Sequence, residues 1–343
     1  MLIFAGTGIS INSLTNEIKT EIKKCDSVYF ETYTSPIDDF LKIFDFDFVE
    51  ASREFVEDGK KILNDAETKN VMLLCYGDPM IATTHMELRN RAIDRGIETK
   101  IFHNSSIITA LPGETGLHSY KFGRTVTETR LSIPSSLYVY YGIHANLVNK
   151  LHTVILLEYD KQNDFFIKPN DAIKNILSRE NEQKKGVCTE DTFVIVCSRI
   201  GLQNPRIYGG KVDDVIKQDF GKPPHCMIIV SELHFTEMES LSKILNIKED
   251  NIPDNSKNVF HKYDEMLNSY IPKTRKALEN AKSKLGSKDN EFSTLFVNIE
   301  SYIEDAERFY TDDKYELAIL SIGYAEGLLD SLSFIGKLDT TWV

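Results

Sequence analysis

Two glycine-containing motifs follow apolar runs, at the position where α/β proteins bind small ligands. The first is FAGTG at residues 4–8, whose glycines allow a ligand close to the backbone. The dinucleotide fingerprint G-x-G-x-x-G needs a further glycine where this chain has Ile11, so that fingerprint is incomplete. A tight turn between a strand and a helix explains the motif equally well.

The second motif is GDPM at residues 77–80, directly after the apolar run VMLLCY. Asp78 and Pro79 are typical N-cap and N1 residues, and they predict the start of a helix here. The end of the preceding strand also faces the sheet edge where ligands bind in α/β folds. The motif therefore predicts a helix start, a ligand contact, or both.

Residues 105–124 form a third candidate region. Ser105, Ser106 and Ile107 follow a predicted strand, and their hydroxyl and amide groups suit an adenosine or a carboxylate, or else cap a helix. The segments LPGETG and YKFGR come next. Loops with glycine, aromatic and basic residues often carry function, although a plain surface loop has the same composition.

The histidines and cysteines form no catalytic or metal-binding pattern. His225 follows two prolines, and we interpret it, like His85, His103 and His144, as a structural residue. Their spacing fits neither a metal triad nor a nucleophile–base pair, and the G-x-S-x-G signature is absent. The five cysteines include no C-x-x-C pair, which favours small buried side chains in a reducing compartment.

Strands alternate with helices in the first part of the chain, which predicts a parallel sheet covered by helices. Helices are predicted at Thr15–Lys24 and Met86–Ala92. The predicted strands of this first unit are Leu2–Ala5, Ser27–Phe30, Val71–Tyr76 and Ile97–Phe102, with Thr153–Glu158 closing it.

A second α/β unit and a helical tail follow. The second unit has predicted helices at Asn170–Glu182 and Asp213–Phe220, and predicted strands at Thr192–Cys197, Arg206–Tyr208 and Cys226–Val230. After about Ile252 the strand signals stop, and three helices are predicted at Lys257–Lys284, Asn290–Tyr310 and Asp313–Ile335. We therefore predict three domains, at residues 1–158, 159–249 and 250–343, of which the last is all-α.

The chain of 343 residues carries a formal net charge of −12. An acidic surface repels phosphates, so nucleic acid and anionic lipid are not expected as partners. No apolar stretch reaches about 18 residues, and the N-terminus lacks a signal pattern. We expect a cytoplasmic protein that neither spans a membrane nor binds a metal.

Several segments together resemble one known family, the diphthine synthases, over about residues 1–247. The combination of GDP-x-x-ATTH with GLHSYKFG and DFGKPPH is specific, whereas no single piece is. The tail departs from this pattern, since its ending SIGYAEGLLDSLSFIG resembles a short helical family of unknown function. The segments that carry the main resemblance are MLIFAGTGIS, YGDPMIATTHMELRNRA, FHNSSIITALPGETGLHSYKFG and SRIGLQNPRIYGGKVDDVIKQDFGKPPHCMIIV.

The resemblance implies a tetrapyrrole-methylase-like α/β fold. Two α/β domains would hold S-adenosyl-L-methionine in the cleft between them, and two copies would form a homodimer. At the positions that match the family's cofactor contacts, the resemblance assigns cofactor binding to Ile9, Asp78, Ile81, Ser106, Ile107, Leu157, Ile200 and His225.

The resemblance also implies an activity, methylation of the amino group of a 3-amino-3-carboxypropyl-histidine on translation elongation factor 2. A model α-amino group has a pKa near ~8, so part of it is neutral without a strong base. We assign no catalytic base, although His225 and Glu114 are candidates to assist. Tyr138, Tyr140 and Tyr141 offer aromatic faces to a cationic product, but we interpret them as alternating residues of a strand.

Three other functions compete with this interpretation. A tetrapyrrole (precorrin-type) methyltransferase shares the cofactor loops, but GLHSYKFG and DFGKPPH disfavour it. A non-catalytic adaptor would use the helical tail and would not bind S-adenosyl-L-methionine. A nicotinamide-dependent dehydrogenase is disfavoured by the incomplete glycine fingerprint.

Overall fold

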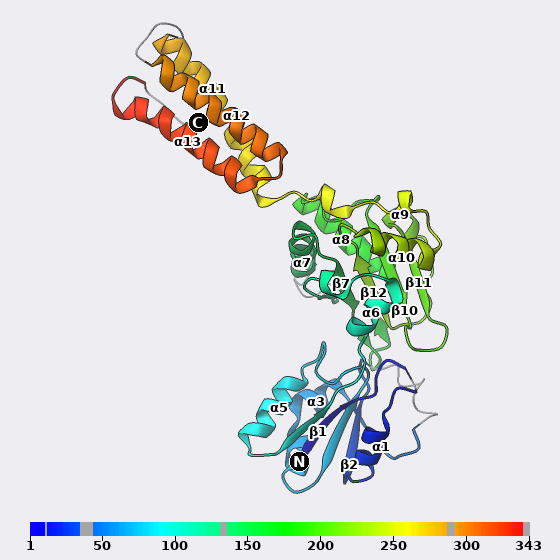
Figure 1. Ribbon diagram of the computed structural model, residues 1–343. Helices are drawn as coiled ribbons and strands as arrows, with labels where there is room; N and C mark the ends of the chain where they lie inside the picture. Colours follow the sequence, from blue (N-terminus) through cyan, green and yellow to red (C-terminus); the bar gives the residue numbers. More distant parts are fainter. Residues whose placement is uncertain (11, 35–43, 131–135, 287–291, 339–343) are drawn as a thin grey trace. The chain divides into compact units, whose positions relative to one another are not determined.

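A computed structural model describes residues 1–10, 12–34, 44–130, 136–286 and 292–338 of the chain. The chain divides into two compact units, Met1–Val259 and Phe260–Val343. The first unit contains two five-stranded sheets with their helices, and the second is a helical bundle (Figure 1). Strands, helices and the bundle confirm the predicted α/β fold class with a C-terminal all-α region.

All strand pairs of the first sheet are parallel, and the strand order is β3-β2-β4-β1-β5. Its central strands are buried throughout, because helices cover both faces and each face packs its own apolar cluster. The strands are β1 (Leu2–Gly6), β2 (Ser27–Glu31), β3 (Val49–Ala51), β4 (Val71–Cys75) and β5 (Thr99–Phe102). The helices described with it are α1 (Asn16–Ile22), α3 (Arg53–Asp58), α4 (Lys60–Ala66) and α5 (His85–Asp94).

The second sheet is mixed, with the order β11-β10-β12-β7-β6. Only β6 and β7 pair in parallel, and the other neighbours are antiparallel. Its strands are β6 (Val126–Glu128), β7 (Thr153–Leu157), β10 (Phe193–Ser198), β11 (Arg206–Lys211) and β12 (His225–Ile229). Its larger helices are α6 (Ile107–Thr115), α7 (Ser136–Val148), α8 (Pro169–Gln183) and α10 (Phe235–Leu245).

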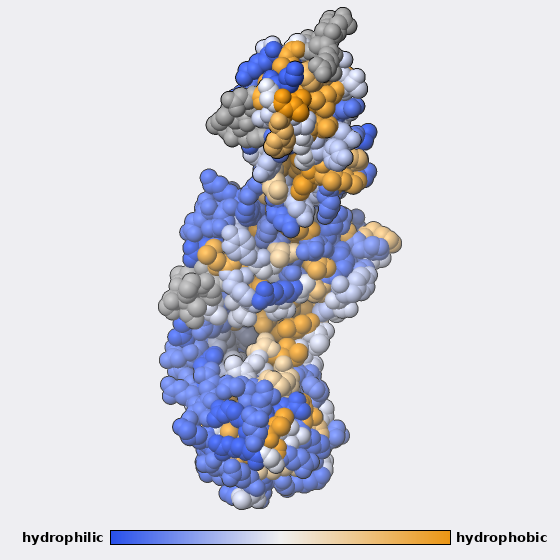
Figure 2. Space-filling view, turned by 90° about the vertical axis from the view of Figure 1, so that its left-hand side faces the viewer, coloured by the Kyte–Doolittle hydropathy of each residue, from blue (hydrophilic) through white to orange (hydrophobic). Residues whose placement is uncertain are grey.

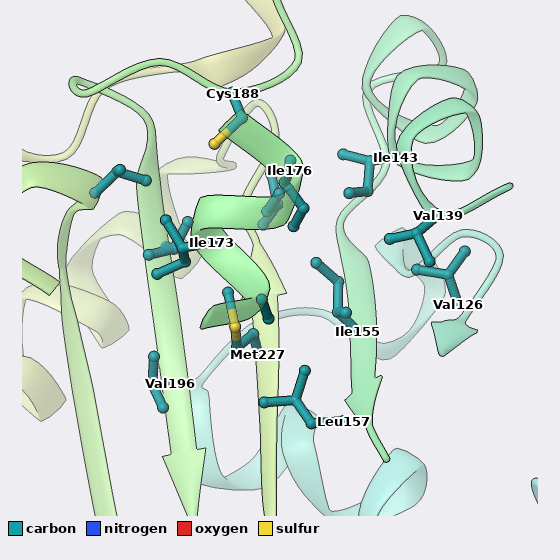
Figure 3. Packing of buried hydrophobic residues seen from close by; sticks show 14 of the residues in the cluster. Val126, Val139, Ile143, Ile155, Leu157, Ile173, Ile176, Cys188, Val196 and Met227 are labelled. Atoms are coloured by element: carbon teal, nitrogen blue, oxygen red, sulfur yellow. The ribbon is translucent and has the colours of Figure 1, made fainter. Parts of the chain in front are cut away.

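Helices α7 and α8 cover one face of the second sheet. In Figure 3, Ile143 of α7 and Ile173 and Ile176 of α8 lie with Ile155 and Met227 of the strands in one apolar cluster. Helices α6 and α10 contribute Leu111 and Leu241 to a separate cluster that also contains residues of β10 and β12.

Two predictions for this region are wrong. The run Thr153–Glu158 was expected to close the first sheet, but β7 lies inside the second. A fully apolar run shows that a strand is buried and does not show which sheet it joins. Tyr138, Tyr140 and Tyr141 are helical residues of α7, because the buried positions recur every three to four residues along that segment.

The remaining elements of the first unit are short. They include the two-stranded hairpin β8 (Tyr159–Asp160) and β9 (Phe165–Phe166), the helix α9 (Val212–Val215), and the 3-10 turns η1 (Ser119–Lys121), η2 (Glu249–Asn251) and η3 (Asn255–Asn258). The buried Asn255 side chain donates to the carbonyl oxygens of Phe193 and Val230, and its Oδ1 accepts from the Phe193 amide. These bonds hold the segment before Val259 against the second sheet.

The C-terminal unit is a bundle of α11 (Lys262–Leu285), α12 (Ser293–Thr311) and α13 (Tyr315–Phe334), which confirms the three predicted helices. Their apolar faces pack into one cluster that includes Leu267, Ile299 and Leu329. By length and hydropathy α13 could cross a membrane, contrary to the expectation that no stretch qualifies. A core helix of a bundle meets the same two criteria, and hydrophobic side chains on the bundle surface are visible in Figure 2.

A buried carboxylate, Glu237, connects α10 to the rest of the second α/β domain. Its oxygens accept hydrogen bonds from the His118 amide, at 2.7 Å, and from the His234 amide, at 2.8 Å. Lys121 Nζ and His152 Nε2 lie 2.9 and 3.1 Å from the same carboxylate. Burial raises the pKa of Glu237, but the bonds from His152, His118, Lys121 and His234 outweigh it and hold the pKa far below its usual range.

We expect Glu237→Ala to lower the free energy of unfolding by about 3 kcal/mol, because it removes the carboxylate that pairs with the partly buried Lys121 and the buried His152. Urea unfolding of both proteins measures this difference. Glu239→Gln is the matched control, since Glu239 lies on the same helix and forms a surface ion pair with the exposed Lys243, and it should change stability by less than about 0.5 kcal/mol. Equal stability of the two variants would contradict the assigned role of Glu237.

Candidate functional site

Asp78 joins two loops of the first sheet, the one that follows β4 and the one that follows β5. Its buried carboxylate accepts from the Met80 amide through Oδ1, at 2.9 Å, and from the Asn104 amide through Oδ2, at 3.0 Å. His103 Nδ1 lies 2.9 Å from the same Oδ2. The segment after β4 is thereby fixed against the segment after β5.

Asn104 adds the end of β1 to this arrangement. Its side-chain nitrogen donates to the carbonyl oxygens of Gly6, at 2.9 Å, and Ser13, at 3.0 Å. Gly8 has a φ of +73°, and a Cβ on it would lie 2.5 Å from the Ser13 Cβ. The first glycine motif therefore fits a tight turn between strand ends.

The predicted helix start at Asp78 is wrong. Asp78 bonds the amide two residues ahead, as in an Asx-turn, and the helix begins at His85. The residues from Met80 to Thr84 form turns and bends instead. Asp and Pro are favoured at helix starts and in turns alike, so the motif alone does not separate the two structures.

Two adjoining cavities lie where these loops meet the second sheet. The larger, the cleft cavity, has a volume of about 450 Å³, within the ~300–1,000 Å³ typical of ligand pockets. The smaller, the Glu31 chamber, measures about 410 Å³ and lies in the first α/β domain. The residues that border both are Thr34, Arg53, Tyr76, Ile81 and Ala82.

Most of the predicted cofactor residues border these cavities. Five of the eight line the cleft cavity, and they come from both α/β domains: Ile81, Ile107, Leu157, Ile200 and His225. Asp78 lines the Glu31 chamber. The structure thus brings together residues separated by more than a hundred positions in the sequence.

Ile9 and Ser106 line neither cavity, and each instead makes contacts within or between the surrounding loops. The Ile9 carbonyl accepts from Tyr76 Oη at 3.1 Å, and a Cβ on Gly201 would lie 2.5 Å from the same carbonyl oxygen. The first loop therefore contacts the second sheet's loop directly. Ser106 caps α6, where its Oγ accepts from the Thr109 amide.

Sequence reasoning missed several residues of the cleft cavity. Tyr76, Cys197 and Cys226 gave no signal beyond their apolar surroundings, yet all three line it. Glu114, proposed as a helper base, lines neither cavity, and nor do Tyr138, Tyr140 and Tyr141. The Tyr140 hydroxyl instead donates to Glu180 Oε2 at 2.8 Å.

The cysteines are buried or half-buried free thiols, and they do not join a metal site in the described residues. Cys75, Cys188, Cys197 and Cys226 are buried free thiols, in line with their interpretation as small buried side chains, and Cys25 is half-buried. Within the described ranges, no three His, Cys, Asp or Glu side chains are grouped so as to hold a metal ion.

His225 is a buried, uncharged polar group in the cleft cavity. Its Nδ1 lies 2.9 Å from Ser198 Oγ, and its Nε2 is buried with no hydrogen-bond partner among the described residues. Burial lowers the pKa of His225 to about 4. The His225 imidazole is therefore neutral at physiological pH.

The depressed pKa of His225 predicts a loss of stability in mild acid. Between pH 6.5 and 4 the unfolded chain binds a proton that the folded chain does not, so the free energy of unfolding falls as the pH falls. Urea unfolding across this range should show a decline in the wild type that His225→Gln reduces by on the order of 3 kcal/mol.

His144→Gln, on the outer part of α7, controls for the loss of a histidine as such. If His225→Gln and the wild type decline in parallel, His225 is charged in the folded protein and the assigned environment is wrong.

Comparisons with known proteins agree with this architecture. The family of tetrapyrrole (corrin/porphyrin) methylases matches residues 1–216, and a family of unknown function, DUF357, matches residues 262–338. The chain is 36% identical over 264 residues to the diphthine synthase of Methanosphaera stadtmanae, covering 74% of this chain and 99% of that protein. It is 37% identical to the diphthine synthase of Methanocaldococcus jannaschii, covering 70% and 97%.

Solved structures give the same result. A crystal structure of a diphthine synthase matches with a TM-score of 0.62 and 28% identity, covering 75% of this chain and 99% of that one. A putative diphthine synthase from Entamoeba histolytica matches with a TM-score of 0.63 and 32% identity, covering 71% and 98%. With two sheets whose loops enclose one cavity and relatives matched over nearly their whole length, the chain belongs to the diphthine synthase family of tetrapyrrole methylases.

Proposed function

We propose that this chain is a methyltransferase that transfers methyl groups from S-adenosyl-L-methionine to elongation factor 2. The acceptor is the amino group of the 3-amino-3-carboxypropyl arm on one histidine, and the product is diphthine, a step of diphthamide biosynthesis. The cleft cavity carries this proposal, because it joins loops of both α/β domains in a chain whose relatives are named diphthine synthases.

The residues of the cleft cavity suit S-adenosyl-L-methionine. Ile107, Leu157 and Ile200 offer apolar surface for the adenine ring. His225 offers a buried polar atom that lacks a protein partner. We therefore propose that these residues, with Ile81, hold the cofactor, and that Ile9, Asp78 and Ser106 shape the loops around it.

The bound cofactor supplies a methyl group already activated by its sulfonium. The protein then has to align the acceptor nitrogen, the methyl carbon and the sulfur, and to exclude water from the reacting groups. S-adenosyl-L-homocysteine is left after each transfer. We further propose that the enzyme is cytoplasmic and acts as a homodimer. Analytical sedimentation of the purified protein tests the dimer.

Two other functions remain as outcomes of the tests. A tetrapyrrole methyltransferase would bind the same cofactor but leave elongation factor 2 unchanged, and the description of the family that matches residues 1–216 favours this as the runner-up. An adaptor would bind no cofactor and would act through the helical unit.

Mass spectrometry of elongation factor 2 tests the activity. The factor carrying the unmethylated arm is incubated with this protein and S-adenosyl-L-methionine, and we expect mass increases of about one methylene unit per transfer on that histidine. Heat-inactivated protein is the control. Bound cofactor with an unmodified factor would indicate the tetrapyrrole rival, and absence of cofactor binding would indicate the adaptor.

Ile107→Trp tests the cofactor site. The indole fills part of the cleft cavity, so the affinity for S-adenosyl-L-homocysteine in calorimetry should fall at least tenfold, or about 1.4 kcal/mol. Ile93→Trp is the matched control, because Ile93 is exposed on α5 and lines neither cavity. Unchanged affinity in Ile107→Trp would place the cofactor elsewhere.

A further inference from the structure

The Glu31 chamber adjoins the cleft cavity and has a polar lining of its own. It contains a carboxylate, Glu31, and a guanidinium, Arg53, together with hydroxyl groups of Tyr33 and Thr34. The two cavities share Arg53 and Tyr76 along their common border. A ligand group in the chamber would therefore lie next to whatever occupies the cleft cavity.

Glu31 is held at the carboxyl end of β2, with only 3% of its surface exposed. The Thr34 amide donates to Glu31 Oε1 at 2.7 Å, and Thr34 Oγ1 lies 2.9 and 2.8 Å from the two carboxylate oxygens. Burial raises the pKa of the Glu31 carboxyl, and the bonds from Thr34 and the charge of Arg53 oppose this rise. A buried carboxylate in this environment is a better proton acceptor than an exposed one.

Arg53 stacks on a neighbouring ring and forms a weak ion pair in the described part of the chain. It is the first residue of α3, and its guanidinium lies 4.8 Å from the centroid of the Tyr33 ring. Its ion pair in the described part of the chain is a long one, at 3.7 Å to the half-exposed Glu57. Stacking on a ring orients the planar donors of an arginine while leaving them open to a carboxylate.

A guanidinium and a proton-accepting carboxylate in one chamber match the two charged groups of an α-amino acid. Arginine recognises a carboxylate through two parallel hydrogen bonds, and a carboxylate accepts from an ammonium. The methyl acceptor of the proposed function ends in such a group.

We propose that the Glu31 chamber binds the α-amino-acid end of the methyl acceptor, with Arg53 pairing with its carboxylate and Glu31 accepting the proton from its ammonium. This proposal rests on the function proposed above. The proton leaves the nitrogen for a Glu31 oxygen, and the freed lone pair forms the new N–C bond. The S–C bond breaks as that bond forms, and its electron pair stays on sulfur, which becomes a neutral thioether.

The other titratable groups around Glu31 do not compete for this proton near neutral pH. Burial raises the pKa of the Tyr33 hydroxyl and the Cys75 thiol, and it lowers the pKa of His85, so all three stay uncharged. The charged groups nearby come from the loop after β4 and from α3: Asp78, Arg53 and Glu57.

Glu31→Gln tests the proton transfer, since glutamine keeps the shape and an acceptor for Thr34. At pH 7 we expect kcat to fall on the order of a hundredfold. Above pH 9 the rate should return towards the wild type, because an amine with a pKa near ~8 is then mostly neutral without a base. Glu50→Gln, on the exposed face of the neighbouring strand β3, is the matched control. An unchanged kcat in Glu31→Gln at pH 7, or a kcat that is lowered by the same factor at every pH, would overturn the role of Glu31.

Arg53→Gln tests the carboxylate contact. The KM for elongation factor 2 carrying the unmethylated arm should rise at least tenfold, while the Kd for S-adenosyl-L-homocysteine changes less than threefold. Arg95→Gln, at the C-cap of α5, is the control, because Arg95 lines neither cavity. An unchanged KM would overturn the role of Arg53.

A direct binding measurement separates this proposal from the proposed function. L-2-aminobutyrate, which matches the end of the arm, is titrated into the full chain saturated with S-adenosyl-L-homocysteine and followed by NMR. Binding that Arg53→Gln abolishes supports the chamber even if the wild type leaves elongation factor 2 unmodified. Methylation by the wild type with an unchanged KM in Arg53→Gln would retain the function and refute the chamber.

Discussion

The carboxylate of Asp78 and the amide of Asn104 hold three strand ends of the first sheet in one arrangement. Asp78 accepts a hydrogen bond from the Asn104 amide, and the Asn104 side chain donates to the carbonyl oxygens of Gly6 and Ser13, so the segments after β1, β4 and β5 are joined. Parallel strands end at the same edge of a sheet, but their loops diverge unless something ties them. Because the loops are tied, Tyr76 and Ile81 stand at the border of both cavities.

The second sheet supplies the other wall, and a different buried carboxylate holds it. Glu237 joins α10 to the segment that contains His118 and Lys121, and that segment leads into β6 on the cavity side of the sheet. The sequence motif GLHSYKFG therefore has a structural role, because it supplies two of the partners of Glu237.

We propose different ligands for the two cavities, the cofactor in the cleft cavity and the methyl acceptor in the Glu31 chamber. The cleft cavity combines the apolar surface of Ile107, Leu157 and Ile200 with the buried imidazole of His225, which suits the proposed cofactor. The Glu31 chamber places the carboxyl group of Glu31 and the guanidinium of Arg53 in one lining, which suits the proposed α-amino-acid acceptor. In the mechanism that we propose, the protein contributes alignment and proton acceptance, and electrophilic activation comes from the cofactor.

The sequence by itself determined the central strands, the helical tail and the family, because buried strands and amphipathic helices have strong periodic patterns. Most of the residues that the family resemblance assigned to the cofactor also border the two cavities. Only the tertiary structure placed β7 in the second sheet, made α7 a helix, and brought Glu31 and Arg53 to one chamber. These features depend on contacts between distant segments. Apolar runs do not specify which partner they join, and a single charged residue has no periodicity to reveal it.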